Sequence, residues 1–257
     1  MQLAEDIKQI TSKQDKEILL MTHIVLGYPS FEVNRDVVRQ MVENGVDLIE
    51  MQIPFSEPMA DGPVIVKANQ DSLENGTTVA QCLEFAAEIT ATYDIPFLFM
   101  TYYNILFKYG EENFFKKAKE LNIKGLIVPD MPPEEGETYF SLARKYQLAP
   151  IMIFAPTSRS ARMKDLAGYG DGFVYCVARK GVTGKQTSFD DEFNDYIGRC
   201  RQSTDLPLAV GFGISAREDV DYLTGKADIA VIGTKTINLV EENGVESVGP
   251  FIKGLRG

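Results

Sequence analysis

"DLIEMQIPFSEPMADGP", residues 47–63, begins as a buried strand and ends as a stiff, acidic loop. Apolar side chains fill most of positions 46–53, but a carboxylate, Glu50, stands among them. Strand alternation places Glu50 on the same face as Gln52. Proline and acidic residues then end the strand at once. A strand that is apolar on both faces is typical of a parallel sheet covered by helices.

The same pattern recurs along the chain and predicts the fold. Short apolar runs alternate with segments whose apolar residues recur at helical spacing, which indicates repeated β-α units. The apolar runs are 18–27, 46–53, 96–101, 125–130, 149–155, 172–178, 207–213 and 227–233. The predicted helices are 31–44, 79–92, 111–121, 134–146, 159–168, 190–202, 216–224 and 236–254.

Eight such units in a chain of 257 residues predict one α/β domain over residues 1–257, a (β/α)₈ barrel. The alternative is a doubly wound open sheet. The strand count and the lack of a Gly-x-Gly-x-x-Gly motif after the first strand weigh against it. Residues 1–12 predict an extra N-terminal helix that closes the bottom of the barrel.

Composition limits the partners and the compartment. The formal net charge is −11 and the pI is near 4.7, which argues against nucleic acid and anionic membranes as partners. Three widely separated cysteines suit reduced thiols and give no disulfide or zinc framework. We find no signal peptide and no apolar run long enough to span a bilayer. The sequence predicts a soluble, cytoplasmic protein.

Two connections are longer than a β-α crossover needs, residues 54–78 and 179–190. Both leave the carboxyl ends of predicted strands, where barrel enzymes hold their active sites. Their glycine, proline and threonine content makes them candidate lids. Glu50 points inward just below the first connection. A partly desolvated glutamate there can take and give a proton near neutral pH. The alternative is a glutamate paired with a buried lysine or arginine, and such residues are scarce in the predicted strands.

Glycines near three strand ends indicate a phosphate site. They occur after the sixth, seventh and eighth strands, in residues 181–184, 211–213 and 233–234. Glycine lets backbone N–H groups approach an anion, and many barrels bind phosphate at these strands. The substrate is therefore predicted to be a small phosphorylated molecule.

The sequence has no motif for metal, nucleophilic or Schiff-base catalysis. We find no metal-ligand spacing and no Ser-His-Asp or Gly-x-Ser-x-Gly arrangement. Lys180 and Lys235 fall in a loop or at a helix start, so no strand-end lysine suggests a Schiff base. The expected chemistry is acid–base catalysis by carboxylates, with no metal and no cofactor.

These motifs together resemble one family, the tryptophan synthase alpha subunit. The opening stretch is similar to the family signature Glu-Leu-Gly-Ile/Val-Pro-Phe-Ser-Asp-Pro-x-Ala-Asp-Gly-Pro. Other matching segments follow in order over nearly the whole chain: TYYN (101–104), VPDMPPEE (128–135), GVTG (181–184), GFGI (211–214) and IGT (232–234). The resemblance implies a barrel lyase that cleaves indole-3-glycerol phosphate by a retro-aldol reaction. It also implies a beta-subunit partner that carries pyridoxal phosphate, in an alpha2beta2 complex.

The resemblance also implies roles for individual residues. Glu50 matches the catalytic glutamate that moves a proton between the glycerol hydroxyl and indole C3. Asp61 matches the aspartate that accepts the indole N–H, Thr183 the residue that clasps this aspartate, and Tyr175 the tyrosine near the glycerol moiety. Two further sets match the walls of the indole pocket (Met100, Ile127, Phe212, Ile232) and the phosphate cradle (Gly184, Gly213, Gly233, Thr234).

The chain departs from the family pattern close to Glu50. Gln52 stands where the family has glycine, and His23 stands where it has Phe or Tyr. Further changes are Tyr28, Glu57 and Val66. Gln52 is placed to reach the Glu50 carboxylate or the glycerol end of the substrate. Two alternatives to the lyase follow: a regulatory subunit with little catalysis that activates a beta partner, and a barrel lyase retuned to another phosphorylated aldol-type substrate.

Overall fold

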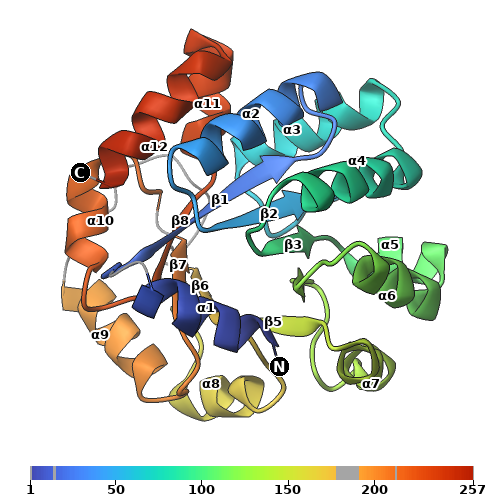
Figure 1. The fold of residues 1–257 in the computed structure, drawn as a ribbon. Coiled ribbons are helices and arrows are strands. Elements are labelled where there is room, and N and C mark those ends of the chain that lie inside the picture. The colour runs from blue at the N-terminus through green and yellow to red at the C-terminus, as the bar shows by residue number, and fades with distance from the viewer. Residues whose placement is uncertain (1, 14–15, 178–190, 212, 257) are drawn as a thin grey trace.

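The computed structural model describes residues 2–13, 16–177, 191–211 and 213–256. Eight parallel strands form a closed barrel in the order β1 to β8, with helices outside it (Figure 1). This confirms the predicted barrel and excludes the open sheet. The strands are β1 Leu19–Val25, β2 Leu48–Gln52, β3 Phe97–Met100, β4 Gly125–Ile127, β5 Ala149–Phe154, β6 Val174–Val177, β7 Leu208–Gly211 and β8 Ile229–Ile232.

The helices follow the predicted segments with three differences. They are α1 Gln2–Lys13, α2 Phe31–Glu43, α3 Pro63–Glu74, α4 Val79–Thr92, α5 Tyr103–Tyr109, α6 Glu111–Glu120, α7 Glu137–Tyr146, α8 Ser160–Ala167, α9 Asp191–Arg201, α10 Arg217–Leu223, α11 Thr234–Asn243, η1 Val245–Ser247 and α12 Val248–Arg256. Two helices were not predicted: α3, inside the first long connection, and the short α5. One helix was predicted over 236–254, but Gly244 at φ 77° separates α11 from η1 and α12.

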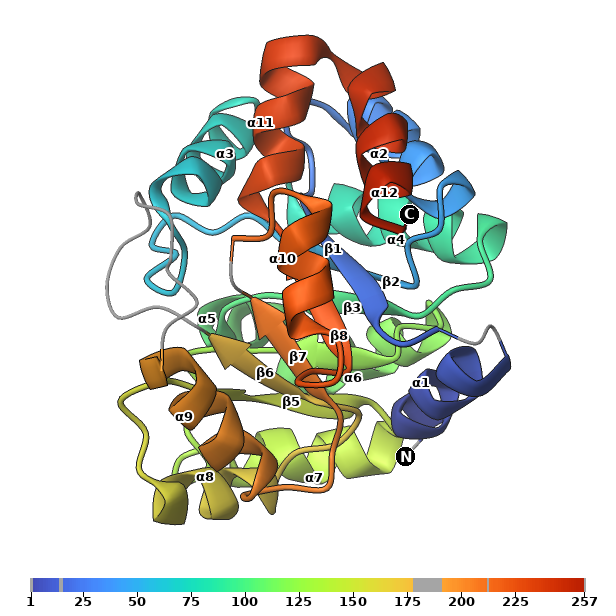
Figure 2. The same ribbon diagram turned by 90° about the vertical axis from the view of Figure 1, so that its left-hand side faces the viewer.

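Strand register defines the inner face of the barrel. His23 of β1 pairs with Glu50 of β2, which pairs with Leu98 of β3. Apolar side chains of the inner face form one cluster that fills the barrel. Leu3 and Ile7 of α1 join that cluster, so α1 closes the barrel bottom as predicted. Figure 2 shows α1 at one end of the barrel and the β2–α3 connection at the other.

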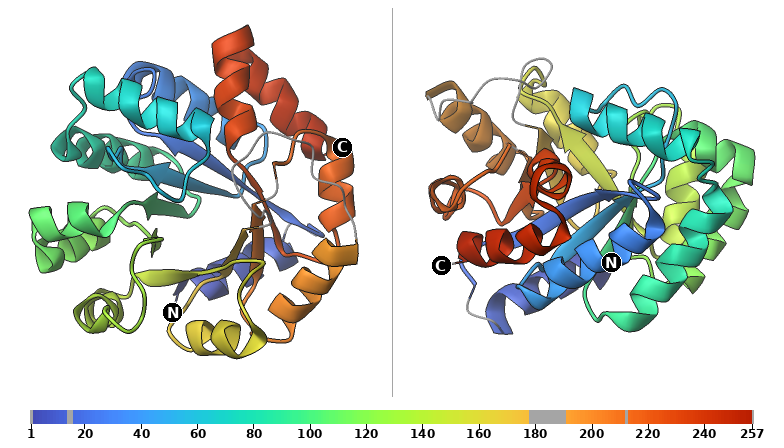
Figure 3. Two further views of the ribbon diagram at one scale, coloured as in Figure 1. Left: turned by 180° about the vertical axis from the view of Figure 1, so that it is seen from behind. Right: turned by 90° about the horizontal axis from the view of Figure 1, so that it is seen from above.

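A second, larger apolar cluster lies between the strands and the helices. Local signals fix the helix ends that enclose it. The Ser30 hydroxyl accepts the Val33 N–H at the start of α2, and Thr78 and Gln81 form a capping box on α4. The views from behind and above in Figure 3 show these helices around the strands. Among the described helices, none is long and apolar enough to cross a membrane.

Candidate active site

Glu50 is buried at the carboxyl end of β2, next to an imidazole. His23 Nδ1 lies 2.9 Å from Glu50 Oε1, and both residues are 3% exposed. An ionised carboxylate only accepts hydrogen bonds, so Nδ1 carries the proton. The alternative partner considered for Glu50 was a lysine or arginine, and the partner in the structure is His23. Glu50 Oε2 and His23 Nε2 are buried and have no partner that meets hydrogen-bond geometry among the described residues, although the Tyr175 side chain lies close enough to Glu50 to interact with it.

Asp61 lies in the loop between β2 and α3, and two side chains hold one of its oxygens. Gln52 Nε2 donates to Asp61 Oδ2 at 2.7 Å, and the Tyr102 hydroxyl donates to the same oxygen at 3.1 Å. Gln52 was expected to reach Glu50 or the substrate. That expectation was incomplete, because its amide bonds to Asp61, the other carboxylate predicted in the site. None of the described residues donates to Asp61 Oδ1.

Tyr102 contacts Asp61 in the site and was not among the predicted site residues. It directly precedes α5 and is 1% exposed. Its hydroxyl also accepts the Ala60 N–H at 3.0 Å, and its ring stacks on Phe55 with centroids 4.9 Å apart. The residue therefore ties the Asp61 loop to β3. The sequence feature that could have identified Tyr102 is its position in TYYN (101–104), just after the end of β3.

Tyr175 of β6 faces Glu50 from across the barrel, and Gly211 of β7 makes room for it. A Cβ on Gly211 would lie 2.9 Å from the Tyr175 ring, closer than real side chains approach. The glycines of residues 211–213 were predicted to bind phosphate. The structure gives Gly211 a different task, because its missing side chain lets the Tyr175 ring lie against the strand.

The predicted indole-pocket residues divide between the two faces of the barrel. Met100 and Ile127 are register partners on the inner face and belong to the barrel-interior cluster. Ile232 instead pairs with Thr22 and packs in the layer between strands and helices, so the structure does not bring it together with Glu50. Strand alternation turns Val231 inward and Ile232 outward, and a contact between Ile232 and indole stays a prediction.

The phosphate-site residues that the structure describes lie after β7 and β8. Gly213 has φ 75°, a conformation that favours glycine, and Gly233 and Thr234 begin α11. A Cβ on Gly233 would lie 3.8 Å from the Cβ of His23, so this helix start adjoins the carboxylate site. Thr183, Gly184 and Phe212 lie outside the described residues.

Burial and mutual charge perturb the titratable groups. Burial lowers the pKa of His23, but the hydrogen bond to Glu50, the charges of Glu50 and Asp61 and the Gln52 amide outweigh it, so the pKa rises above 6.5. Burial raises the pKa of Asp61 above its usual 3.8, although His23, Gln52 and Tyr102 oppose this rise. Burial, the two carboxylate charges and an interaction with Glu50 hold the pKa of Tyr175 well above 10.0.

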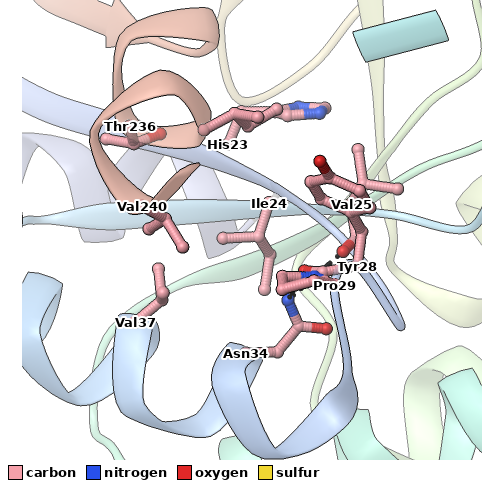
Figure 4. Close-up of a pocket in the computed structure, with 10 residues that line it drawn as sticks. His23, Ile24, Val25, Tyr28, Pro29, Asn34, Val37, Thr236 and Val240 are labelled. Atoms are coloured by element: carbon pink, nitrogen blue, oxygen red, sulfur yellow. Dashed lines mark hydrogen bonds between the residues drawn. The ribbon is translucent and has the colours of Figure 1, made fainter. Parts of the chain in front are cut away.

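A small cavity of about 30 Å³ lies behind His23, between β1, α2 and α11. Figure 4 shows Ile24 pointing towards Val37 and Val240, while the His23 ring lies on the other side of the strand. The imidazole thus faces Glu50 and the barrel mouth. Within the part of the chain that the structure describes, no group of three or more His, Cys, Asp or Glu side chains is placed to hold a metal.

A closed (β/α)₈ barrel with a buried and a partly buried carboxylate, a tyrosine and an imidazole at its carboxyl end defines a barrel enzyme equipped for acid–base chemistry. The family model described as "Tryptophan synthase alpha chain" matches residues 10–249. The chain belongs to the tryptophan synthase alpha chain family, which is a family of lyases. The family predicted from the sequence motifs is confirmed.

Curated relatives and solved structures agree with this placement. The tryptophan synthase alpha chain of Desulfotalea psychrophila is 67% identical over 95% of this chain and 96% of its own length. The alpha chain of Desulforapulum autotrophicum is 60% identical over 95% of this chain and 96% of its own length. A structure from Aquifex aeolicus shares 33% identity and superposes with a TM-score of 0.88, covering 99% of this chain and 97% of that one.

Proposed function

We propose that this chain cleaves indole-3-glycerol phosphate to indole and glyceraldehyde 3-phosphate, and that Glu50 carries the proton. Family membership supports the reaction. The observation that supports the role of Glu50 is that its two carboxylate oxygens have different surroundings. Oε1 is held at 2.9 Å by His23, whereas Oε2 is buried without a partner among the described residues. A buried acceptor without a partner is costly, and a substrate hydroxyl would satisfy it.

The proposed chemistry balances around one carboxyl group. A proton goes to indole C3, and the ring nitrogen gains positive charge. The glycerol hydroxyl next to the scissile bond loses its proton and becomes the aldehyde carbonyl. The electron pair of the breaking C–C bond returns to the indole ring. Glu50 both accepts and donates a proton in this cycle, so it is regenerated in each turnover.

Asp61 is proposed to stabilise the charge on the indole nitrogen. Gln52 and Tyr102 fix Oδ2, and Oδ1 remains for the indole N–H. A fixed carboxylate in a desolvated site stabilises a developing positive charge more strongly than one in water. Tyr175 is proposed to lie against the glycerol moiety and Thr183 to clasp Asp61.

The remaining substrate groups have proposed places around these residues. Met100 and Ile127 present apolar surface on the inner face and are proposed to contact the indole, together with Phe212. The phosphate is proposed to bind at the N–H groups of the α11 start, where the helix dipole favours an anion. The proposed phosphate residues are Gly184, Gly213, Gly233 and Thr234.

Replacing Glu50 with Gln tests the central role. The amide keeps the size of the side chain but removes the proton carrier, so indole release should fall by ~100-fold or more. Binding of a glycerol phosphate analogue should persist. Glu74, an exposed carboxylate at the end of α3, provides the matched control, and Glu74→Gln should keep full activity. Near-normal turnover by Glu50→Gln would remove Glu50 from the mechanism.

We also propose a beta-subunit partner, with pyridoxal phosphate held by that subunit and not by this chain. One chain in a structure of the tryptophan synthase complex from Pyrococcus furiosus superposes on this chain with a TM-score of 0.83 at 26% identity. Met59 is 83% exposed and Phe107 is 63% exposed, which is unusual for large apolar side chains. The Tyr102–Ala60 hydrogen bond joins the two segments that carry them. An alpha2beta2 assembly and a cytoplasmic location stay predictions.

Charge placed on this surface tests the partner. Phe107→Asp should weaken association with a beta subunit by at least ~10-fold, because a carboxylate would be desolvated in the interface. Tyr169→Asp is the matched control. Tyr169 is also an exposed large side chain, at 43%, but it lies beside Phe140 of α7 and not in the segments of Met59 and Phe107. Equal beta binding by the two variants would move the interface elsewhere. Indole release with and without the beta subunit would also separate a lyase from a purely regulatory subunit.

A further inference from the structure

Gln52 and His23 extend the carboxylate site beyond Glu50 and Asp61. Because the Asp61 carboxylate accepts, the NH₂ group of Gln52 must face it, and Gln52 Oε1 points the other way. Gln52 Oε1 and His23 Nε2 are both buried and have no partner that meets hydrogen-bond geometry among the described residues. The Gln52 amide nevertheless lies close enough to the imidazole to raise its pKa.

Few charged groups act on the His23 imidazole and its neighbouring carboxylates. Glu50 of β2 and Asp61 of the β2–α3 loop act on His23, and His23 and Glu50 act on Asp61. Tyr175 faces Glu50 from β6. The side of β1 nearest β8 and α11 presents the uncharged Gly233 and Thr236. Among these described groups the imidazolium is the one positive charge, and it faces two carboxylates that share one desolvated site.

We propose that His23, as an imidazolium, is a positioning residue for this lyase: it holds Glu50 by Oε1, turns Oε2 to the substrate and balances the charge of two neighbouring carboxylates. This inference rests on the proposed role of Glu50. Without a cation, two carboxylates in one desolvated site would repel each other, and one would tend to take up a proton. With His23 charged, both carboxylates can be ionised together, and Glu50 can carry the proton of the glycerol hydroxyl to indole C3.

The direction of the pH dependence follows from the geometry and the raised pKa of His23. The imidazolium exists below that pKa and is lost as the pH rises through it. The part of kcat that depends on His23 should therefore decline at alkaline pH. A side chain that only filled space would leave the pH profile unchanged.

The chain has a single histidine, so a protein without a histidine tag gives one imidazole Cε1–H signal by NMR. We expect it to titrate above 6.5 in the wild type and at lower pH in Glu50→Gln, because the carboxylate charge is gone. This measurement needs no activity. Titration below 6.5, or the same titration in both proteins, would overturn the ion pair.

Kinetics of two variants test the positioning role. In His23→Asn, Nδ2 lies near the place of Nδ1 and still donates, but it carries no charge. We expect kcat to fall by ~10-fold and the alkaline decline due to His23 to disappear, with KM unchanged within about twofold. His23→Phe, which removes the donor as well, should lose more.

The outcomes separate this inference from the proposed function. If Glu50→Gln abolishes turnover but His23→Phe is as fast as the wild type, His23 is merely tolerated and only the positioning role fails. The same holds if His23→Asn keeps the wild-type kcat and pH profile. If Glu50→Gln keeps its turnover, the proposed function itself fails.

Discussion

Two buried carboxylates three residues apart, Asp47 and Glu50, meet opposite surroundings. Asp47 Oδ1 accepts from Lys16 at 2.5 Å, and Oδ2 accepts from the Leu20 N–H at 2.8 Å and from Arg256. Both of its oxygens are satisfied at the amino end of the barrel. Glu50 has one partner, and its second oxygen has none among the described residues.

The difference separates stability from function along one strand. A buried carboxylate with every oxygen satisfied fixes structure, and here it joins the segment before β1 and the last helix to the start of β2. A carboxylate with an unsatisfied oxygen weakens the fold and keeps a site ready for a substrate. Changes at these two residues should therefore affect different measurements.

The largest expected effect on stability comes from Asp47→Asn. The amide cannot accept at both positions and leaves Lys16 and Arg256 partly unpaired, which should cost about 3 kcal/mol in the free energy of unfolding. The kcat of the folded protein should stay within about twofold, because Asp47 lies at the opposite end of β2. Urea unfolding and indole release measure the two quantities. Glu50→Gln should do the reverse, and a loss of activity without a loss of stability in Asp47→Asn would break the comparison.

The sequence predicted this fold well because each strand and helix is encoded locally. Apolar runs and helical spacing located all eight strands, and an acidic strand residue before a proline-rich loop located Glu50. The helix α3 was missed because it lies in a segment that begins with Pro54 and contains Asp61-Gly62-Pro63, which reads as a loop. Pro63 in fact occupies the first helical position, which suits proline.

The sequence could not predict the pairing of side chains across strands. The His23–Glu50 contact depends on the register of β1 and β2, which two apolar strands do not specify. The outward position of Ile232 depends on where β8 starts its alternation, and a shift of one residue reverses it. Tyr102 becomes a site residue only because the Asp61 loop folds back over β3. Contacts distant in sequence thus remained for the structure to supply.

A moderate effect is expected from Tyr102→Phe. The change removes the hydrogen bonds to Asp61 and to the Ala60 N–H but keeps the stacked ring on Phe55. Losing a bond to a charged group costs roughly 1.5 kcal/mol, so kcat/KM should fall by ~10-fold. Tyr146→Phe, which removes an exposed bond to Glu112, is the control and should be silent. Equal activity of both variants would show that the Asp61 loop is positioned without Tyr102.

The smallest expected effect is the pH dependence of the contribution that His23 makes to stability. The folded state raises the pKa of His23 above 6.5, so the imidazolium stabilises the fold fully below that pH, and this contribution is lost as the pH rises through the folded pKa. The stability of the wild type minus that of His23→Asn should therefore decline on going from weakly acidic to alkaline pH. The effect should be smaller than that at Asp47, because burial works against the charged imidazole. In a Glu50→Gln background the decline should weaken, since the carboxylate that favours the charged ring is absent. If the stability difference between the wild type and His23→Asn grew with pH, burial would outweigh Glu50 in setting the pKa of His23. The buried imidazole would then be neutral, and Glu50, unlike Asp47, would have no cation beside it.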